Sequence, residues 1–501
     1  MQNKSQGANA KESRSCPYLD TVDRKVLDFD LEKECSVTLS HKNVYVCLVC
    51  GVYLQGRAEN TPVYFHSMQE DHHVFLNTET KKFYCLPDNY EIVDHSLEDI
   101  KMALDPEFTP ESIKKLDSNT MHYRVPTGDE YLPGEMGMNV VDNADYVNVV
   151  VQALSHVTPI RDFFLIPANY SYTSNPLVHS FGVLIRKLWS HTRFKCNVTP
   201  YEFLNEVTRS SNEKFTVKER RDASEFLCWL LNSLHTALKD KEHKTTVIDR
   251  CFKGRIEVTR RTYKLVGISG FQKSSRIPVS AWKWPPTTAA CTSTFPRPRI
   301  SQILAGNEAK VETAVKQQDY WMLSLDLPPI PLFRNSNNDS VVNKLPLYSL
   351  LKKFDGETPT KEIWENAEKT YRIVKLPRYL IFAIHRFQKN EFFFEKNTSI
   401  VQFPIRNMEM RHFFFPPRRA ATVEFDLVAN ICHDVDLEED REKKKRNPLL
   451  ENPVTKGSYR IHMKNNADDE WYEIQELVVK PTRAELVMLS ESSILVFERK
   501  D

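Results

Sequence analysis

The sequence predicts an α+β protein, and three observations indicate this organisation. Apolar residues recur at helical spacing after about residue 131, which predicts core helices. Later segments are rich in aromatic and β-branched residues, which predicts strands. Helices that come first and strands that follow are typical of an α+β domain. Five of the 10 cysteines lie within the first 85 residues, which predicts a metal-binding module ahead of that domain.

Length and charge limit the possible classes of function. The 501 residues exceed the roughly 100–200 residues of one domain, so we expect several domains. Lysine and arginine total 68 against 67 acidic residues, so the net charge of +1 gives no global attraction to nucleic acid or anionic membrane. No apolar run reaches the ~18 residues of a membrane span. The polar start lacks the apolar stretch of a secretory signal, so we expect a reducing compartment.

Composition divides the chain into four segments. We predict a disordered tail at 1–14, a compact Cys/His-rich module at 15–104, a linker at 105–130 and a main domain at 131–501. The linker should contain one short helix that starts after Thr109, because Pro110 favours the first helical position.

Two stretches interrupt the main domain. Residues 265–312 are rich in proline, serine and threonine, which predicts an insertion that is at least partly disordered. Residues 434–456 carry a mixed run of acidic and basic residues, which is typical of a solvated excursion. The alternative for this second stretch is a docking segment for a partner.

The main domain begins with apolar helical patterns and continues with strand patterns. One helix should bury a face formed by Tyr146, Val149, Val150, Ala153 and Leu154. A second repeats this spacing after Asp222, which is a suitable N-cap residue. Strands are predicted within later segments at 320–327, 378–387, 398–404, 425–433, 458–463 and 494–500.

Two cysteines and two histidines predict a zinc site in the first module. Cys47 and Cys50 form a Cys-x2-Cys pair, and His66 and His72 follow with five residues between them. Four such ligands complete a tetrahedral Zn2+ and leave no open position for catalysis, so we expect one structural zinc ion. His73 is an alternative ligand to His72. The other explanation, core thiols and hydrogen-bonded histidines, must account for four donors in a segment too small to hold much core.

These residues belong to a longer resemblance. The segments CPYLD, CLVCG, LQGR and FYCLPDNYEIVDHSLEDI, with the two histidines, resemble the ubiquitin-specific-protease-type (UBP-type) zinc finger over residues 15–100. The resemblance implies a small α/β module that in many relatives binds the free Gly-Gly tail of ubiquitin. Further zinc sets of that family are incomplete here, so Cys16, Cys35 and Cys85 are expected to be structural thiols.

The ubiquitin-tail pocket that the resemblance implies is expected to be defective. Arg57 matches the tail-binding arginine of the family, but Ala58, Tyr84 and Leu86 stand where relatives place aromatic residues that enclose the glycines. A buried carboxylate needs both its charged donor and its walls. Ubiquitin is therefore a doubtful partner of this finger.

The main domain resembles the ubiquitin-specific cysteine proteases, which have a papain-like fold of thumb, palm and fingers. Matching motifs run in the family's order from LPGEMGMNVVDNADYVNVVVQAL through DASEFLCWLLNSL, LPRYLIFAIHRF and GSYRIH to WYEIQE. The cysteine, histidine and acidic residue of the family's triad align with Asp145, Ser458 and Gln475. The resemblance thus implies that the triad is vacant and the protein is not an enzyme. Asp145 is instead expected to cap the helix that starts there.

Other residues that could replace the triad are expected to be structural. Cys432 and His433 are neighbours in a strand pattern, so their side chains should point to opposite faces. His462 is a weaker candidate still. Relatives hold a zinc ion in the fingers with two Cys-x2-Cys pairs, but Arg260 and Arg261 stand near that position here, so we expect fingers without metal.

The combination of this finger with a protease fold lacking its triad resembles the ubiquitin-protease-like splicing factors of the U4/U6.U5 tri-snRNP. That resemblance implies a nuclear, non-catalytic scaffold that supports assembly or stability of the tri-snRNP, with spliceosomal proteins as partners. Basic and aromatic residues are not interleaved in any long patch, so direct nucleic-acid binding is not expected. The alternatives are a ubiquitin-binding adaptor without catalysis and an active deubiquitinase with unorthodox residues.

Overall fold

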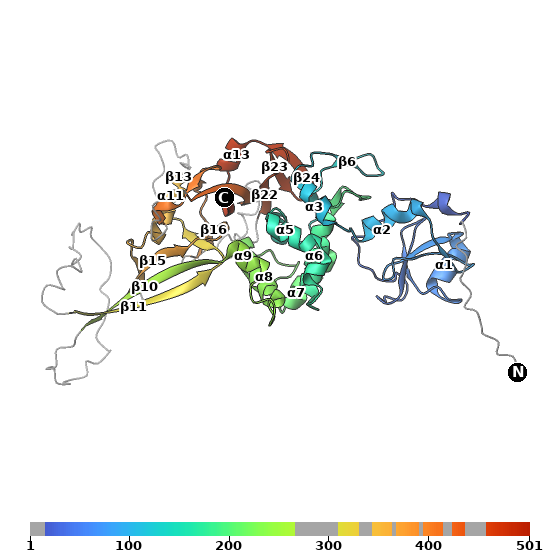
Figure 1. The fold of residues 1–501 in the computed structure, drawn as a ribbon, viewed down its shortest axis with the longest axis horizontal. Coiled ribbons are helices and arrows are strands. Elements are labelled where there is room, and N and C mark those ends of the chain that lie inside the picture. The colour runs from blue at the N-terminus through green and yellow to red at the C-terminus, as the bar shows by residue number, and fades with distance from the viewer. Residues whose placement is uncertain are drawn as a thin grey trace, which may run out of the picture.

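The computed structural model describes residues 16–265, 309–329, 343–362, 367–389, 394–413, 423–435 and 457–500. Figure 1 shows the first module at one end of the molecule, a group of helices beside it, and a long hairpin at the opposite end. The predicted tail and most of the two predicted insertions lie outside the described residues. None of the helices in the described ranges has the length and apolar character that crossing a bilayer requires.

The first module folds around a five-stranded antiparallel sheet in the order β2-β1-β3-β4-β5. Its elements are η1 (Leu19–Thr21), β1 (Val44–Cys47), β2 (Tyr53–Gln55), α1 (Pro62–Glu70), β3 (Val74–Asn77), β4 (Phe83–Cys85), β5 (Tyr90–Ile92), η2 (His95–Leu97) and α2 (Glu98–Leu104). Strand β1 is buried at all four residues. Val44 and Val46 join one apolar cluster with α2, whereas Tyr45 and Cys47 join another with Val63 of α1. The alternation of a strand thus supplies a core on each face of the sheet.

Helices dominate the next part of the chain. They are α3 (Pro110–Leu116), α4 (Asp145–Ser155), α5 (Thr158–Leu165), η3 (Pro167–Tyr170), α6 (Pro176–Leu188), α7 (Tyr201–Ser210), α8 (Ala223–Leu238) and α9 (Val247–Phe252), with short strands β6 (Tyr123–Arg124), β7 (Glu130–Tyr131), β8 (Gly137–Met138) and β9 (Asn197–Val198). Helix α3 begins after Thr109, as predicted, and a capping box with Ser112 closes its first turn. The predicted N-cap of α8 is also confirmed, since Asp222 accepts from the backbone N–H groups of Ser224 and Glu225.

A large sheet contacts helices α4, α8 and α9. It runs in the order β12-β16-β25-β21-β22-β23-β24, and β20 pairs with β21 at its side. Every segment predicted to hold a strand holds one. The strands and the nearby short helices are β12 (Leu323–Asp326), β13 (Lys344–Pro346), α11 (Leu347–Leu351), η4 (Lys352–Phe354), β16 (Tyr379–His385), β17 (Phe387–Lys389), β18 (Phe394–Lys396), β19 (Ile400–Gln402), β20 (Met408–Glu409), η5 (Arg411–Phe413), β21 (Glu424–Asp434), β22 (Ser458–Lys464), β23 (Trp471–Gln475), β24 (Val478–Thr482), α13 (Ala484–Met488) and β25 (Ser492–Arg499).

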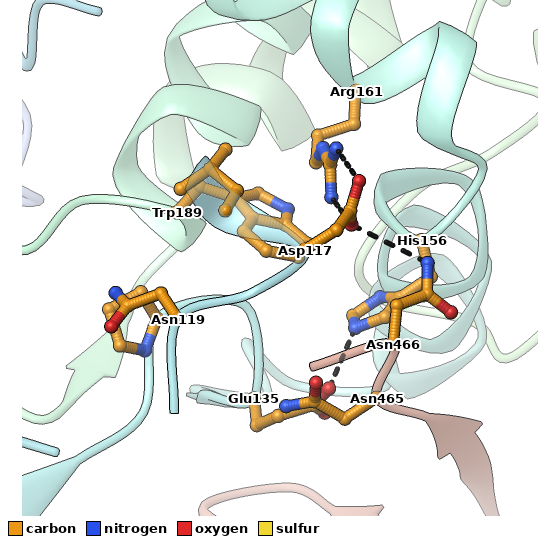
Figure 2. Close-up of a pocket in the computed structure, with 10 residues that line it drawn as sticks. Asp117, Asn119, Glu135, His156, Arg161, Trp189, Asn465 and Asn466 are labelled. Carbon is orange, nitrogen blue, oxygen red and sulfur yellow. Dashed lines mark hydrogen bonds and ion pairs between the residues drawn. The ribbon is translucent and has the colours of Figure 1, made fainter. Parts of the chain in front are cut away.

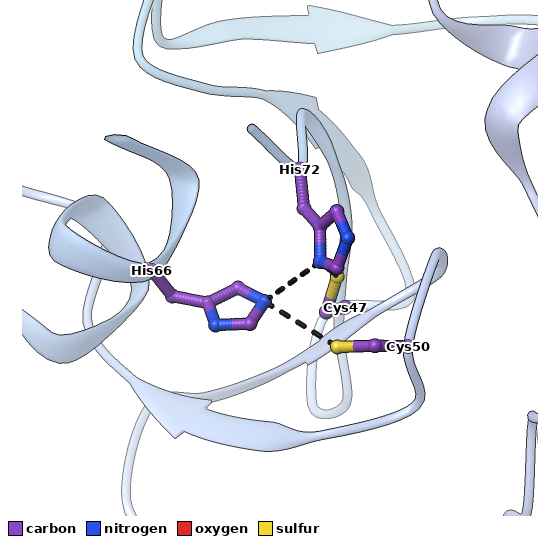
Figure 3. A group of neighbouring side chains, drawn as sticks. All are labelled: Cys47, Cys50, His66 and His72. Atoms are coloured by element: carbon purple, nitrogen blue, oxygen red, sulfur yellow. Dashed lines mark hydrogen bonds between the residues drawn. The ribbon is translucent and has the colours of Figure 1, made fainter. Parts of the chain in front are cut away.

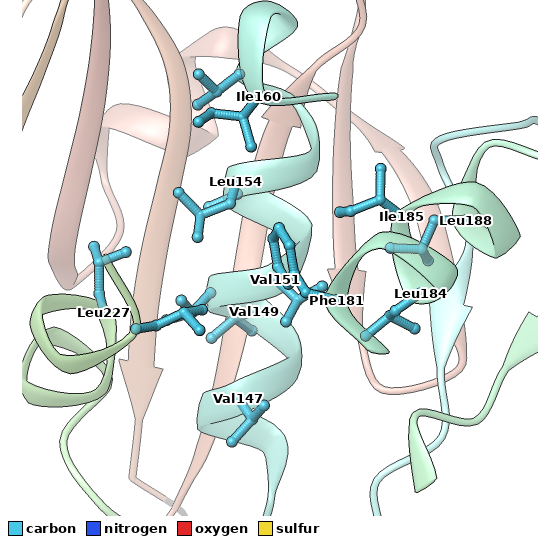
Figure 4. Close-up of a cluster of buried hydrophobic side chains, with 14 of the residues drawn as sticks. Val147, Val149, Val151, Leu154, Ile160, Phe181, Leu184, Ile185, Leu188 and Leu227 are labelled. Atoms are coloured by element: carbon cyan, nitrogen blue, oxygen red, sulfur yellow. The ribbon is translucent and has the colours of Figure 1, made fainter. Parts of the chain in front are cut away.

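Helix α4 lies at the centre of the main core. Figure 4 shows its valines between Leu227 of α8 on one side and Phe181 and Ile185 of α6 on the other. The five residues of the predicted buried face are buried, and so are all the other residues of this helix. The reason is that strands β21 and β22 contact α4 together with helices α5 and α8, which leaves no face for solvent.

A second sheet forms the hairpin at the far end (Figure 1). Its order is β11-β10-β15-β14, formed by β10 (Gly254–Leu265), β11 (Ala309–Tyr320), β14 (Thr360–Glu362) and β15 (Ala367–Lys375). Leu265 and residues 309–312, which the sequence assigned to an insertion, belong to paired strands of this hairpin. The boundaries of that insertion were therefore too wide, because ladder pairing extends the strands into the polar stretch. Arg260 and Arg261 pair with β11 and β15.

Buried ion pairs fix the first module to the helices. The carboxylate of Asp30 accepts from Lys187 at 2.9 Å and from Arg193 at 2.8 Å, and all three side chains are at most 6% exposed. Burial alone would raise the pKa of Asp30, but Arg193 and Lys187 outweigh burial and hold that pKa well below its usual range. Lys187 also donates to the backbone oxygen of Phe29 at 2.9 Å. A second contact joins Arg186 to Asp105 at 2.9 Å.

Candidate functional site

Four side chains of the first module converge on one point, as Figure 3 shows. Nε2 of His66 lies 3.4 Å from Sγ of Cys50 and 3.1 Å from Nδ1 of His72. Nδ1 of His72 lies 3.5 Å from Sγ of Cys47. All four ligand atoms lie within 4.8 Å of one another. The structure therefore brings together the two cysteines and two histidines that the sequence singled out.

Tight turns place these side chains. Cys47 ends β1 and Cys50 lies in the turn that follows, where the N–H of Gly51 donates to the backbone oxygen of Cys47 at 2.9 Å. Gly51 has φ of +77°, and a Cβ there would lie 2.6 Å from another backbone oxygen, so this turn requires glycine. Asp71, in the left-handed region at φ 58°, ends helix α1 and turns the chain towards His72.

The cluster fits a tetrahedral zinc ion. With Zn–S near 2.3 Å and Zn–N near 2.0–2.1 Å, neighbouring ligand atoms should lie roughly 3.3–3.8 Å apart. The measured separations of 3.1, 3.4 and 3.5 Å are close to that spacing. Burial raises the pKa of the Cys47 thiol to about 12, so a bound cation would displace the thiol proton. Because four protein ligands fill the tetrahedron, such an ion would stabilise the fold and perform no chemistry.

His73, the alternative ligand, is used elsewhere in the module. Its Nδ1 lies 2.7 Å from the backbone oxygen of Leu86, and its Nε2 lies 3.0 Å from a carboxylate oxygen of Asp71. Its ring packs against Tyr18 with the centroids 3.9 Å apart. The geometry therefore favours His72 as the fourth ligand.

The remaining cysteines of the module are bonded or packed inside the fold. Sγ of Cys35 accepts from the backbone N–H groups of Thr38 at 3.4 Å and Gln55 at 3.2 Å. Cys16 and Cys85 are buried in the apolar cluster that includes α2. These contacts give each thiol a structural role.

Arg57 is held by its own module. Its guanidinium lies 4.0 Å from the centre of the Tyr84 ring, and Nη1 donates to Asn89 at 3.0 Å. Leu86 is fully buried and Ala58 is exposed without an aromatic ring. Of the three positions that would line a tail-binding pocket, only Tyr84 supplies an aromatic ring, and that ring already packs against Arg57.

Asp145 is buried at the first residue of α4. Its Oδ1 accepts from Nε of Arg220 at 2.7 Å, and its Oδ2 accepts from the backbone N–H of Tyr459 at 2.8 Å. The helix starts at Asp145 as expected, but the predicted N-cap was wrong, because Ala144 is the N-cap and Asp145 is the first helical residue. The Asp145 carboxylate still accepts a hydrogen bond from a backbone N–H group of the first helical turn, that of Tyr146, at 3.0 Å.

Ser458 and Gln475 form a hydrogen bond across β22 and β23, with Nε2 of Gln475 donating to Oγ of Ser458 at 2.8 Å. Gly457, at φ +90°, makes the turn into β22, and a Cβ there would collide with the backbone oxygen of Asp434. The backbone N–H of Tyr459, the residue after Ser458, donates to Asp145. The three positions that align with the catalytic triad therefore lie close together. Their side chains supply a carboxylate, a hydroxyl and an amide.

A thiol, an imidazole and a carboxylate meet elsewhere on the same sheet. Sγ of Cys432 lies 3.8 Å from Nδ1 of His462, and Nε2 of His462 lies 3.0 Å from Oε2 of Glu473. Sequence reasoning missed this group, because the group depends on how strands β21 and β22 pair in the folded sheet. Asn430 pairs with His462 in the β21–β22 register, so the even-numbered residues of both strands share one face.

This group lacks the properties of a nucleophile site. Cys432 and His462 are 0% and 1% exposed. Burial raises the pKa of the Cys432 thiol to about 11 and lowers the pKa of His462, so the thiol stays protonated at neutral pH. The thiol donates to Oγ of Ser490 at 3.2 Å. His433 lies on the opposite face, as predicted, with its ring centroid 4.7 Å from that of Tyr459.

A small polar cavity lies beside helix α4, and Figure 2 shows its lining. Nε2 of His156 lies 2.9 Å from a carboxylate oxygen of Glu135, and both side chains are at most 4% exposed. Arg161 donates to both carboxylate oxygens of Asp117 at 2.7 and 3.0 Å. The cavity measures about 10 Å³, which is room for a single water at most, so it cannot hold a substrate.

Comparison with known proteins identifies the family to which this fold belongs. The family model described as "Ubiquitin carboxyl-terminal hydrolase" matches residues 136–497, which is more than half of the chain. The chain belongs to the ubiquitin carboxyl-terminal hydrolase family. A second model, "Zn-finger in ubiquitin-hydrolases and other protein", matches residues 33–97, which include all four converging cysteines and histidines. The predicted fold class, a UBP-type zinc finger followed by a ubiquitin-specific protease fold, is confirmed.

Relatives within the ubiquitin carboxyl-terminal hydrolase family include proteins named for splicing. The human "Ubiquitin carboxyl-terminal hydrolase 39" is 40% identical over 98% of this chain and 81% of its own length. The "Probable mRNA-splicing protein ubp10" of Schizosaccharomyces pombe is 34% identical over 96% of this chain and 88% of its own. A solved structure described as "Crystal structure of an essential yeast splicing factor" has a TM-score of 0.70 at 27% identity and covers 97% of this chain and all of its own. The resemblance to ubiquitin-protease-like splicing factors is thereby confirmed.

Proposed function

We propose that this protein is a non-catalytic scaffold in pre-mRNA splicing that supports assembly or stability of the U4/U6.U5 tri-snRNP. The observation that carries the proposal is the bonding of Asp145, Ser458 and Gln475 into the fold at the place where a hydrolase of this family would need a thiol and an imidazole. Relatives named as splicing factors support the process. The proposed location is the nucleus and the proposed partners are spliceosomal proteins, with no direct nucleic-acid contact and no membrane.

The proposed loss of chemistry follows from the residue types. The attack on an isopeptide carbonyl needs a thiolate, and a second group must take up and return the proton. The oxygens of Asp145 are engaged by Arg220 and Tyr459, and a carboxylate is a poor attacker of amides. The amide of Gln475 donates to Ser458 and has no basic nitrogen that could activate the hydroxyl.

The domain organisation and metal content are part of the proposal. We assign a tail to residues 1–14, the zinc finger to 15–104, a linker to 105–130 and the inactive protease-like domain to 131–501. We assign a single structural Zn2+ to Cys47, Cys50, His66 and His72. The distances within that cluster support this assignment.

Affinity purification from nuclear extract tests the scaffold role. Tagged full-length protein should retain tri-snRNP proteins together with the U4, U5 and U6 small nuclear RNAs, whereas the tag alone should retain neither. Recovery without any of these components would overturn the proposal.

A ubiquitin probe with an electrophilic C-terminus tests the absence of chemistry. We expect no covalent adduct with the full-length protein. An adduct that disappears in Cys432→Ser would instead reveal an active enzyme that uses the buried thiol.

NMR titration of isotope-labelled ubiquitin with the full-length protein tests the alternative of a ubiquitin-binding adaptor. Saturable chemical-shift changes in ubiquitin, combined with failure to recover tri-snRNP components, would favour that alternative.

A further inference from the structure

A groove of about 440 Å³ lies between the zinc finger and helix α7, lined by Leu31, Glu32, Glu34, Leu39 and Tyr201, among others. We propose that this groove binds an extended basic segment of a partner protein, with a large apolar side chain on the groove floor and neighbouring lysine or arginine side chains against the two glutamates. The inference does not depend on the proposed role in splicing, since the groove shares no residue with the positions aligned to the triad.

The apolar part of the groove is presented to solvent at a conformational cost. Leu31 is 43% exposed and Leu39 is 70% exposed, although both are large apolar side chains. Leu39 also has φ of 55°, the left-handed region that bulky residues rarely adopt. Its N–H donates to the backbone oxygen of Cys35 at 2.9 Å, which holds this conformation. Leu31 and Leu39 line the same groove, so a partner that buried both side chains would remove apolar surface from water.

The charge of the groove selects a basic occupant. The ligand atoms of Glu32, Glu34 and His41 lie within 4.8 Å of one another. Across the part of the chain that the structure describes, neither Glu32 nor Glu34 forms an ion pair, and the intervening Lys33 bonds to Glu202 at 2.9 Å. Two neighbouring carboxylates repel each other, and a lysine or arginine from a partner would relieve that repulsion.

The walls of the groove are fixed relative to each other. The ion pair of Lys33 with Glu202 joins the zinc finger to α7. A few residues away, Asp30 is buried against Lys187 and Arg193. A preformed groove spares the partner the free energy of ordering this surface.

Fluorescence anisotropy with the full-length protein tests the proposal. The probe is a labelled synthetic peptide in which leucine alternates with pairs of lysine and arginine. One reference peptide replaces its basic residues with glutamate, and another replaces leucine with serine. We expect saturable binding of the basic apolar peptide only. E32Q/E34Q should weaken that binding about fivefold, as two partly exposed ion pairs would. Leu39→Ser should weaken it about threefold through lost apolar contact.

A matched variant controls for unspecific attraction. Glu59 and Glu242 are exposed, lie outside the groove and form no ion pair among the described residues, so E59Q/E242Q makes the same change of charge elsewhere. Its affinity for the peptide should equal that of the wild type. Equal binding by E32Q/E34Q, equal binding of the acidic peptide, or no binding at all would overturn the proposal. A dimer in sedimentation that dissociates in E32Q/E34Q would also overturn it, because the occupant would then be a second copy of this chain.

Discussion

The carboxylate of Asp145 is a buried structural group, and its removal should be costly. Asp145→Ala takes one partner from Arg220 and leaves the buried N–H of Tyr459 without its acceptor. We expect a loss of about 2–3 kcal/mol in the free energy of unfolding, measured by urea denaturation. Glu219→Gln removes the exposed ion pair with Arg221 and should cost at most about 0.5 kcal/mol. Equal unfolding free energies for the two variants would show that Asp145 has no structural role.

The buried pair of His156 and Glu135 predicts stability that depends on pH. Burial alone would lower the pKa of His156, but Glu135 at 2.9 Å outweighs burial and raises this pKa above its ordinary value. The contribution of the pair is therefore fully present below the unfolded pKa of about 6.5 and is lost as pH rises through the raised folded pKa. We expect Glu135→Gln to cost about 3 kcal/mol near pH 6, and less at higher pH.

Urea denaturation of the wild type and of Glu135→Gln across a pH series checks this expectation. The pH dependence is the decisive part, because lost packing alone would produce a constant difference between wild type and variant. A difference in unfolding free energy that stays constant, or that grows as pH rises, would contradict the raised pKa of His156 in the folded protein.

At the scale of elements, the zinc finger should depend on its metal for folding. Its sheet is short-stranded and its two apolar clusters are small, so zinc binding should supply much of its folding free energy. We expect metal analysis to give about one zinc per chain, and Cys50→Ser to lose that zinc along with the fold of residues 16–104. Cys196→Ser, which changes a half-buried thiol in the helical part, should keep the zinc. Full zinc retention by Cys50→Ser would disprove the assigned ligand set.

The sequence predicted those elements whose signals are local. The cap at Asp222, the helix after Thr109 and the strand around Cys432 each follow from residues close together in the chain. The convergence of the two cysteines and two histidines was predictable for the same reason, since two short-range pairs need only one tertiary contact. The contact of Cys432 with His462 depends instead on the register of β21 against β22, which no local pattern specifies.

Burial was the other property that local patterns could not give. Helix α4 has a clear apolar periodicity, yet polar residues such as Asn148 and Gln152 are buried as well. They are accommodated because Asn148 donates to the backbone oxygen of Asn139 and Gln152 donates to that of Met136. Those partners lie directly before and after strand β8, which approaches α4 only in the folded domain. Periodicity alone therefore predicts the face of a helix but not how many layers enclose it.

At the scale of the whole molecule, the zinc finger and the protease-like domain are held as one unit by Asp30. Its carboxylate bonds to Lys187 and Arg193, which both lie in the helical part of the chain. A buried cation without its partner is strongly unfavourable, so the pairing specifies one relative placement of the two parts.

Asp30→Ala should separate the two parts of the molecule. The change leaves Lys187 and Arg193 buried with their shared carboxylate removed, at a cost of about 3–5 kcal/mol. We expect the wild type to unfold in one thermal transition and Asp30→Ala to unfold in two, with limited proteolysis of the variant beginning near residues 105–130. Because the cations hold the pKa of Asp30 well below its usual range, its stabilisation is present above the unfolded pKa of about 3.8 and is lost as pH falls through the lower folded pKa. Acidification of the wild type below that unfolded pKa should therefore lower its free energy of unfolding. Asp20→Ala, which changes an exposed carboxylate of the same module, should unfold as the wild type does. A single unchanged transition in Asp30→Ala would mean that the apolar contacts around Phe29 and Phe194 hold the two parts together without the ion pairs.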